Sequence, residues 1–156
     1  MKSTVKELRE IVEKHVALFS KMSDEEFAKK PLPNKWSKQE VLGHLIDSAH
    51  NNLRRFIAGQ YESAPPKIFY EQDFWVQAGG YQRMSKKDVI ALWKLINEHI
   101  GRVLSGMDPA NYSRKADTGK ESINLHTLQF LAEDYVKHMK HHINQIIPGS
   151  YDIVYS

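Results

Sequence analysis

The sequence predicts an all-α fold, a four-helix bundle with a long, aromatic-rich connection between its second and third helices. Four segments repeat apolar residues at spacings of three and four, the period of a helix that packs one face against a core. Several of these segments follow a serine or threonine with an acidic residue three positions later, a typical helix start. No segment alternates apolar and polar residues over the length of a strand, so we expect no β-sheet core.

The first long helix is predicted to run from Thr4 to about Lys21. Thr4 and Glu7 have the spacing of a capping box, and the apolar residues between them and Lys21 keep helical spacing. A short helical turn is predicted at residues 23–28. The two prolines that follow this turn exclude regular structure until the next helix begins.

The second long helix is predicted over residues 38–58. Ser37 and Glu40 form the clearest capping box of the chain at its start, and Gly59 is expected to act as its C-cap. A broad apolar face predicts that this helix packs in the core. Beside that face runs a continuous polar stripe that is able to line a functional groove, made of His44, Ser48, Asn51, Asn52 and Arg55.

The third and fourth long helices are predicted at residues 85–106 and 124–147. Apolar residues of the third repeat at alternating spacings of four and three, as in a bundle helix, and Gly106 ends it. The fourth helix is stopped by a Pro-Gly pair at residues 148–149. Together with the first two helices, they make residues 1–156 a single four-helix-bundle domain.

Two connections and a tail lie outside these helices. Residues 60–84 form a long connection dense in aromatic side chains. Connections of this length are usually functional or disordered, and the aromatics oppose disorder, so we expect this one to cover a site. Residues 105–123 are polar and predict a surface loop, and residues 151–155 predict an extended strip.

The composition excludes several classes of protein. No apolar run approaches the length of a membrane-spanning helix, and no apolar secretory segment opens the chain. The net charge of +3 is spread along the chain, whereas nucleic-acid binders concentrate positive charge on one face. The absence of cysteine excludes disulfide scaffolds, thiolate zinc sites and a cysteine nucleophile. We therefore expect a cytoplasmic protein without a membrane or nucleic-acid partner.

Histidines carry the clearest chemical signal. His138 and His142 are four residues apart on the fourth predicted helix, so they lie one turn apart on one face, at the flank of the apolar stripe. His141 is expected to point to the opposite side, toward solvent. Such a pair is a common way to present two imidazoles to one metal ion, although incidental pairs are also frequent.

A divalent ion needs a third ligand from elsewhere in the chain. His44 on the second predicted helix is the natural candidate, although a helical projection places it about 140° from the centre of the apolar face. His50 is its rival, and spacing alone does not exclude it. Asp47 and Asp134 are explained as residues of solvated helix faces.

Three segments, in order, resemble the DinB/YfiT-like superfamily of metalloenzymes. Residues 35–48, KWSKQEVLGHLIDS, are similar to its W-S/T-x-x-E-x-x-x-H-L-x-D-S signature. Residues 134–146, DYVKHMKHHINQI, are similar to its closing H-x-x-x-H-x-x-Q-I helix, and residues 70–81 to its middle loop. Each motif alone is weak, but three in the right order and spacing are specific and span nearly the whole chain.

The resemblance implies a four-helix bundle that holds one divalent metal ion through His44, His138 and His142, and it favours His44 over His50. It also implies a homodimer and a metal-dependent activity on a small molecule. Relatives of this kind include hydrolases and enzymes that use a low-molecular-weight thiol as cosubstrate, such as S-transferases and isomerases. The sequence identifies no catalytic base.

Three neutral imidazoles leave a coordination position open, which is typical of a catalytic metal site. Zinc or nickel suits imidazole ligands best, and iron or manganese also fits. The predicted substrate-binding residues are Trp75 in the aromatic connection, Tyr135 and Arg55. The alternative hypotheses are a non-enzymatic, stress-linked metal-binding protein and a helical interaction module with incidental histidines.

Overall fold

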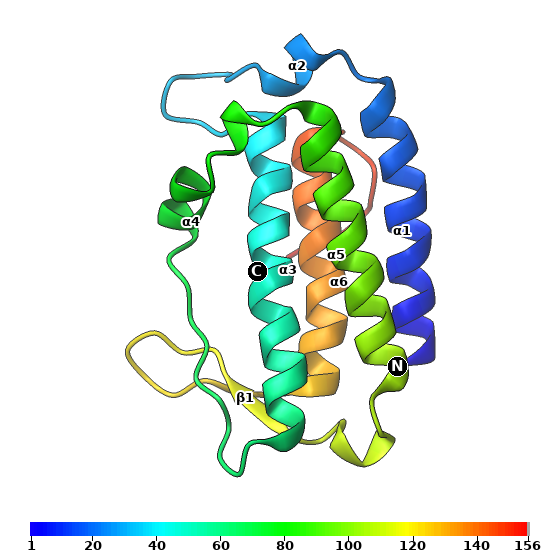
Figure 1. Cartoon of the computed structure of the whole chain (residues 1–156), viewed down its shortest axis with the longest axis vertical. Helices are drawn as coiled ribbons and strands as arrows, with labels where there is room; N and C mark the ends of the chain where they lie inside the picture. Colours follow the sequence, from blue (N-terminus) through cyan, green and yellow to red (C-terminus); the bar gives the residue numbers. More distant parts are fainter. Residues whose placement is uncertain (156) are drawn as a thin grey trace.

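Four long helices lie side by side along the longest axis of the molecule (Figure 1). The computed structural model describes residues 1–155, and within them it confirms the predicted all-α bundle. None of its helices is long and apolar enough to cross a membrane. The long helices are α1 (Lys2–Lys21), α3 (Lys38–Tyr61), α5 (Lys86–Gly106) and α6 (Leu128–Ile146). The short elements are α2 (Asp24–Ala28), α4 (Gln72–Gly79), the 3-10 helices η1 (Tyr81–Arg83) and η2 (Pro109–Asn111), and the strands β1 (Lys115–Asp117) and β2 (Leu125–Thr127).

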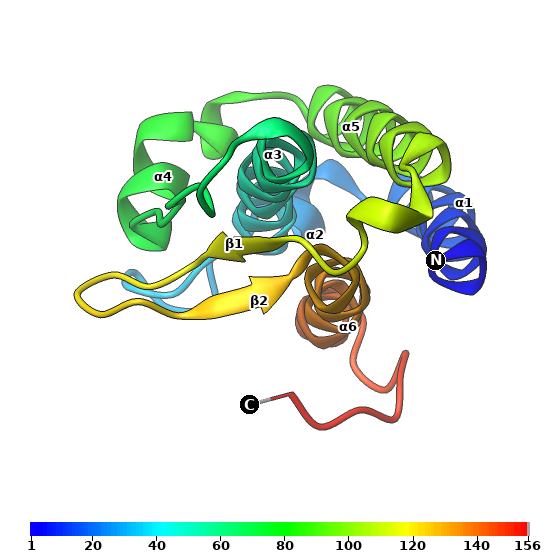
Figure 2. The ribbon, with the colours of Figure 1, turned by 90° about the horizontal axis from the view of Figure 1, so that it is seen from below.

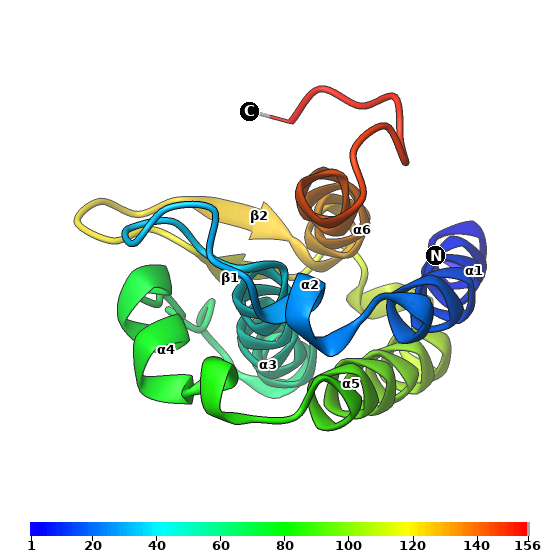
Figure 3. The same cartoon turned by 90° about the horizontal axis from the view of Figure 1, so that it is seen from above.

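The order of the helices around the bundle differs from their order along the chain. Viewed along the bundle, α1 and α3 lie diagonally opposite each other, and α5 and α6 occupy the two positions between them (Figure 2 and Figure 3). Because α3 and α5 run in the same direction, the chain has to return along the bundle before α5 begins (Figure 1). A 24-residue helix is about 36 Å long, which explains the length of the connection at residues 62–85.

This connection contains a helix that the sequence pattern did not predict. α4 spans eight residues, and Gly80 ends it with a φ of 65°, in the left-handed region that glycine adopts readily. Only Val76 of α4 is buried. A helix anchored by one side chain shows no apolar stripe, so its period is invisible in the sequence.

The predicted helix starts are confirmed in part. The capping box at α3 is present: the Ser37 hydroxyl accepts a hydrogen bond from the Glu40 amide at 3.0 Å, and Glu40 Oε1 accepts one from the Ser37 amide at 3.2 Å. The box predicted at Thr4 is wrong, because α1 already begins at Lys2 and has no side-chain cap.

Two boundaries of the later helices are also corrected. α3 continues past Gly59 to Tyr61, so Gly59 is not its C-cap. Gly59 instead allows Leu128 of α6 to pack closely, since a Cβ on residue 59 would lie 2.6 Å from Leu128 Cδ2. The fourth helix begins at Leu128 and not at residue 124, because residues 125–127 pair as β2 with β1 in an antiparallel hairpin. Thr127 then caps α6 through a 3.1 Å bond from the Phe130 amide.

The hairpin also revises the surface loop predicted at residues 105–123. Ala116 and Asp117 are buried, and Asp117 Oδ1 accepts hydrogen bonds from the amides of Gly119 and Asn124. The tail follows the prediction more closely, because Tyr151 and Tyr155 pack back onto the bundle without regular structure.

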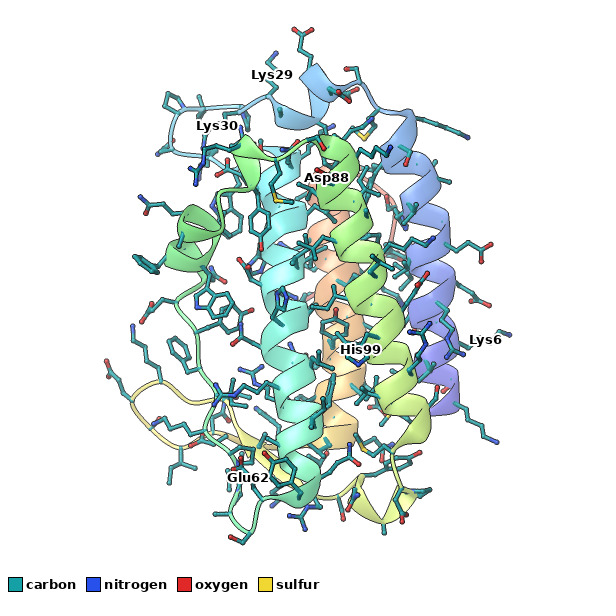
Figure 4. All side chains as sticks on the ribbon, viewed as in Figure 1. Lys6, Lys29, Lys30, Glu62, Asp88 and His99 are labelled. Carbon is teal, nitrogen blue, oxygen red and sulfur yellow. The ribbon has the colours of Figure 1, made fainter. Side chains whose placement is uncertain are left out.

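The core fills the space between the four long helices, while charged side chains such as Lys6 and Lys29 project into solvent (Figure 4). Trp93 of α5, Phe19 of α1 and Phe56 of α3 are all completely buried. Close packing extends to the side of α3 that faces η1. There Tyr81 lies directly on Gly43, next to His44 in the sequence.

We predict that Gly43→Ala destabilises the protein by about 1–3 kcal/mol, because an added methyl group overpacks this contact. A Cβ at residue 43 would lie 2.1 Å from Tyr81 Cδ2, so the ring has to move. Gly106→Ala is the matched control, since nothing lies within 4 Å of its Cβ position. Urea denaturation of both variants measures the difference, and equal stability of the two would contradict the packing described.

Candidate metal centre

Three histidines from two helices meet in the seam between α3 and α6. His44 comes from α3, and His138 and His142 come from successive turns of α6. Each offers one ring nitrogen, and these nitrogens all lie within 4.8 Å of one another. The Nε2 atoms of His44 and His138 are 3.2 Å apart. The ring centroid of His142 lies 4.5 Å from each of the other two.

His44 is fully buried, which the helical projection of α3 did not anticipate. α3 packs against α5, α6 and α4 on different sides, so every residue from 41 to 49 is buried and no single apolar stripe defines its contacts. The projection assumed one buried face and therefore misplaced His44. His50, the rival candidate, is exposed and lies outside the histidine group.

Neighbouring side chains hold two of the rings in place. The Nδ1–H of His142 donates to Gln145 Oε1 at 2.9 Å, because an amide oxygen only accepts. This bond leaves the lone pair of His142 on Nε2, where it is free to bind a cation. The indole of Trp36 packs on His44 with 5.1 Å between the ring centroids.

Burial keeps all three imidazoles uncharged. Desolvation, followed by the nearby His142, lowers the pKa of His44 to about 3. Desolvation also lowers the pKa of His138 well below its ordinary value, with further contributions from the neighbouring histidines, and burial lowers that of His142. Neutral imidazole is the form that binds metal ions.

Two ring nitrogens in the group lack partners. Nδ1 of His44 and Nδ1 of His138 are buried and form no hydrogen bond within residues 1–155. Leaving a buried polar atom without a partner costs about 1–3 kcal/mol. The group therefore contributes little to the stability of the bundle by itself, and the free energy of binding a ligand would offset this cost.

Cavities lie on both flanks of the histidine group. The larger cleft, of about 860 Å³, is lined by Trp36 and Gln145 beside the group and by several lysines near α2. The smaller cavity, of about 180 Å³, opens beside His138 between α3, α6 and the hairpin. Its polar lining comes mainly from Ser48, Asn52, Arg55, Tyr70, Asp134 and Tyr155.

The smaller cavity includes two of the three predicted substrate-binding residues. Arg55 is buried and lines it, although the sequence allowed it to be a plain helix charge. Tyr135 also lines it, but its hydroxyl donates away to Asn97 Oδ1 of α5 at 2.5 Å. Trp75 does not line it; this side chain is 38% exposed and packs on Tyr70, which does.

Two expectations about residues near the histidines were wrong. Asp47 is not on a solvated face: it is buried and accepts a 2.6 Å hydrogen bond from the Tyr81 hydroxyl, and burial raises the pKa of Asp47 to about 6. His141 does not point to the opposite side of α6. It is half-buried, with its ring 4.9 Å from that of His142 and 5.5 Å from that of Tyr155.

The DinB superfamily model matches residues 7–146, so the chain belongs to the DinB superfamily. No curated protein matches it significantly. Among solved structures, it is similar to YfiT from Bacillus subtilis, described as a probable metal-dependent hydrolase with an unusual four-helix bundle topology. The TM-score is 0.81 at 22% identity, over 93% of this chain and 82% of YfiT.

Two further structures share the fold at lower identity. A mycothiol-dependent maleylpyruvate isomerase gives a TM-score of 0.69 at 10% identity over 91% of this chain, which spans 59% of the isomerase. The DinB-like protein YjoA from Bacillus subtilis gives 0.61 at 16% identity, over 98% of this chain and 96% of YjoA. Identities this low establish the shared fold alone.

We predict that acid destabilises the metal-free protein. The pKa of His44 is about 3 in the folded chain and about 6.5 in an unfolded one, so the unfolded state binds more protons between these values. The contribution of His44 to stability therefore falls as the pH drops below about 6.5. His44 alone accounts for about 2 kcal/mol between pH 7 and pH 5.

Urea denaturation of chelator-treated protein at the two pH values measures this effect. His44→Leu should remove the contribution of His44, and His99→Gln is the matched control because His99 is exposed on α5 (Figure 4). An equal pH dependence in His44→Leu and wild type would contradict the burial of a neutral His44.

Proposed function

We propose that this chain is a metal-dependent enzyme, a hydrolase in the first instance, that acts on a small molecule. One divalent ion held by His44, His138 and His142 would be its centre. The observation that carries the proposal is the convergence of three neutral ring nitrogens within 4.8 Å, next to a cavity. Zinc or nickel is the metal we favour, because both suit imidazole ligands.

The separation of two of the ring nitrogens fits such an ion. Nitrogens bonded to zinc lie about 2.0–2.1 Å from it, so two of them at a tetrahedral angle are about 3.3 Å apart. The Nε2 atoms of His44 and His138 are 3.2 Å apart. The bond from His142 to Gln145 directs the third lone pair to Nε2. No carboxylate belongs to the group, which is therefore composed of imidazoles alone.

The residues around the group have separate roles in this proposal. A divalent ion with three neutral ligands lowers the pKa of a water or thiol in its open position toward neutrality. Gln145 fixes the tautomer and orientation of His142. Trp36 packs on His44 and keeps water from one side of its ring. Arg55 and Tyr135 line the adjacent cavity and are proposed to contact the substrate, with Trp75 acting through Tyr70.

A thiol-dependent transfer is the second candidate. Its support is the likeness to an isomerase that depends on mycothiol, together with the absence of cysteine from this chain. A thiolate in the open position would have to come from a small-molecule cosubstrate. We also propose a homodimer, as the resemblance to the superfamily implies.

We predict that the purified protein, prepared without a histidine tag, binds one zinc or nickel ion per chain. His142→Ala should abolish stoichiometric binding, because it removes one of three ligands. His141→Ala is the matched control on the next residue of the same helix and should retain the ion, since His141 lies outside the group. Elemental analysis and calorimetric titration measure both.

Equal loss of metal in the two variants would mean that the ligand set is wrong. If neither variant nor wild type retained an ion, the histidines would be incidental and the interaction-module hypothesis would replace the proposal. A protein that binds metal but hydrolyses nothing and transfers no thiol in a substrate screen would favour the non-enzymatic metal-binding hypothesis.

A further inference from the structure

Arg55 is a buried cation that faces the smaller cavity. Its side chain projects from α3 on the polar stripe that begins at His44, and only 8% of the residue is exposed. Burial lowers the pKa of Arg55, but a guanidinium stays charged at any physiological pH. A charge withdrawn from water this far is costly unless it is paired.

The hydrogen bonds of Arg55 account for only part of its donors. Nε and Nη2 both donate to the carbonyl oxygen of Ile68, at 3.2 and 2.6 Å, and Nη1 donates to Asn52 Oδ1 at 3.3 Å. A guanidinium has five N–H groups, so one N–H on each Nη is left over. All the acceptors are neutral, and Arg55 forms no ion pair with a carboxylate of residues 1–155.

Other groups around the cavity also suit a small polar ligand. Ser48 and Asn52 lie on the same side of α3 as Arg55, and Tyr70 faces them from the connection. Asp134 lines the cavity as well, and its charge acts on Arg55 through space. However, Asp134 Oδ2 already accepts a 3.0 Å hydrogen bond from the Tyr155 hydroxyl of the tail.

The cavity connects this cation to the histidine group. His138 forms part of its lining, while Arg55 lies eleven residues after His44 on α3, about 16 Å along the helix axis. Arginine side chains are long and span part of that distance. Because Arg55 and His138 line the same cavity, a ligand bound at Arg55 would extend toward His138.

We propose that the cavity binds the carboxylate group of a small-molecule ligand, with Arg55 as its anchor. The two remaining Nη donors meet a carboxylate, and the ligand supplies the negative charge that the buried guanidinium lacks. Identifying this ligand as the substrate rests on the proposed metal-dependent function. The substrate class is then narrowed to small carboxylates.

The test uses metal-free protein, so that its outcome does not depend on the metal site. Propionate and glutarate are titrated into it, with their primary amides as uncharged counterparts, and NMR follows the side-chain Nε–H resonance of Arg55. We expect saturable shifts with the carboxylates at millimolar concentrations and none with the amides. Because this readout needs no substitution, it stays valid if Arg55 variants fail to fold.

Arg55→Gln should weaken binding at least about tenfold, because it removes the charge that pairs with the carboxylate. Arg114→Gln is the matched control. Arg114 also donates to backbone carbonyls, those of Gly59 and Glu62 at the C-terminal end of α3, but lies outside the cavity. It should lose stability and retain carboxylate binding.

Several results would overturn the inference. They are equal binding by Arg55→Gln and wild type, equal binding of acids and amides, or no saturable shift of the Arg55 resonance. If the wild-type protein binds carboxylates but takes up no metal ion when one is offered, the proposed function fails while the Arg55 anchor stands. The two proposals therefore fail separately.

Discussion

The structure depends on one unusual contact, the packing of three uncharged imidazoles, one buried and two half-buried, in the seam between α3 and α6. Packing alone does not explain it, because the Nδ1 atoms of His44 and His138 have no partner within residues 1–155. Desolvation keeps the rings neutral, and their mutual proximity would penalise any proton added to them. A bundle that places the Nε2 atoms of two uncharged imidazoles 3.2 Å apart has the chemistry of a cation site.

The topology of the bundle supplies the surroundings of this seam. Because α3 and α5 run parallel, the chain returns along α3 for its whole length and covers the side of that helix away from α1 (Figure 1 and Figure 3). This return segment places Tyr81 on Gly43 and the Ile68 carbonyl on Arg55. The connection at residues 62–85 thus packs on α3 beside the histidines and also holds Arg55 in the adjacent cavity.

Periodicity and capping predicted the four long helices. Helical projection, which assumes that a helix buries only one face, gave the wrong burial for residues of α3. α3 is enclosed on several sides, so His44 and Asp47 are buried although they lie off its apolar face. α4 has one buried side chain, and β1 and β2 have three residues each, too few for a pattern to emerge. The spacing of His138 and His142 predicted that the two side chains lie together, because both are on one helix. The choice of His44 over His50 came from resemblance to the superfamily, since pairing between helices distant in sequence leaves no local signal.

The most direct test of this account is the visible spectrum of the cobalt-substituted protein. We predict one cobalt per chain with the absorption of a low-symmetry site bound by nitrogen ligands, together with a change in the spectrum when a small exogenous ligand is added. A thiolate-to-cobalt charge-transfer band on titration with a low-molecular-weight thiol would favour thiol chemistry over hydrolysis. No stoichiometric uptake of cobalt, or a spectrum that no added ligand perturbs, would contradict an open three-histidine centre.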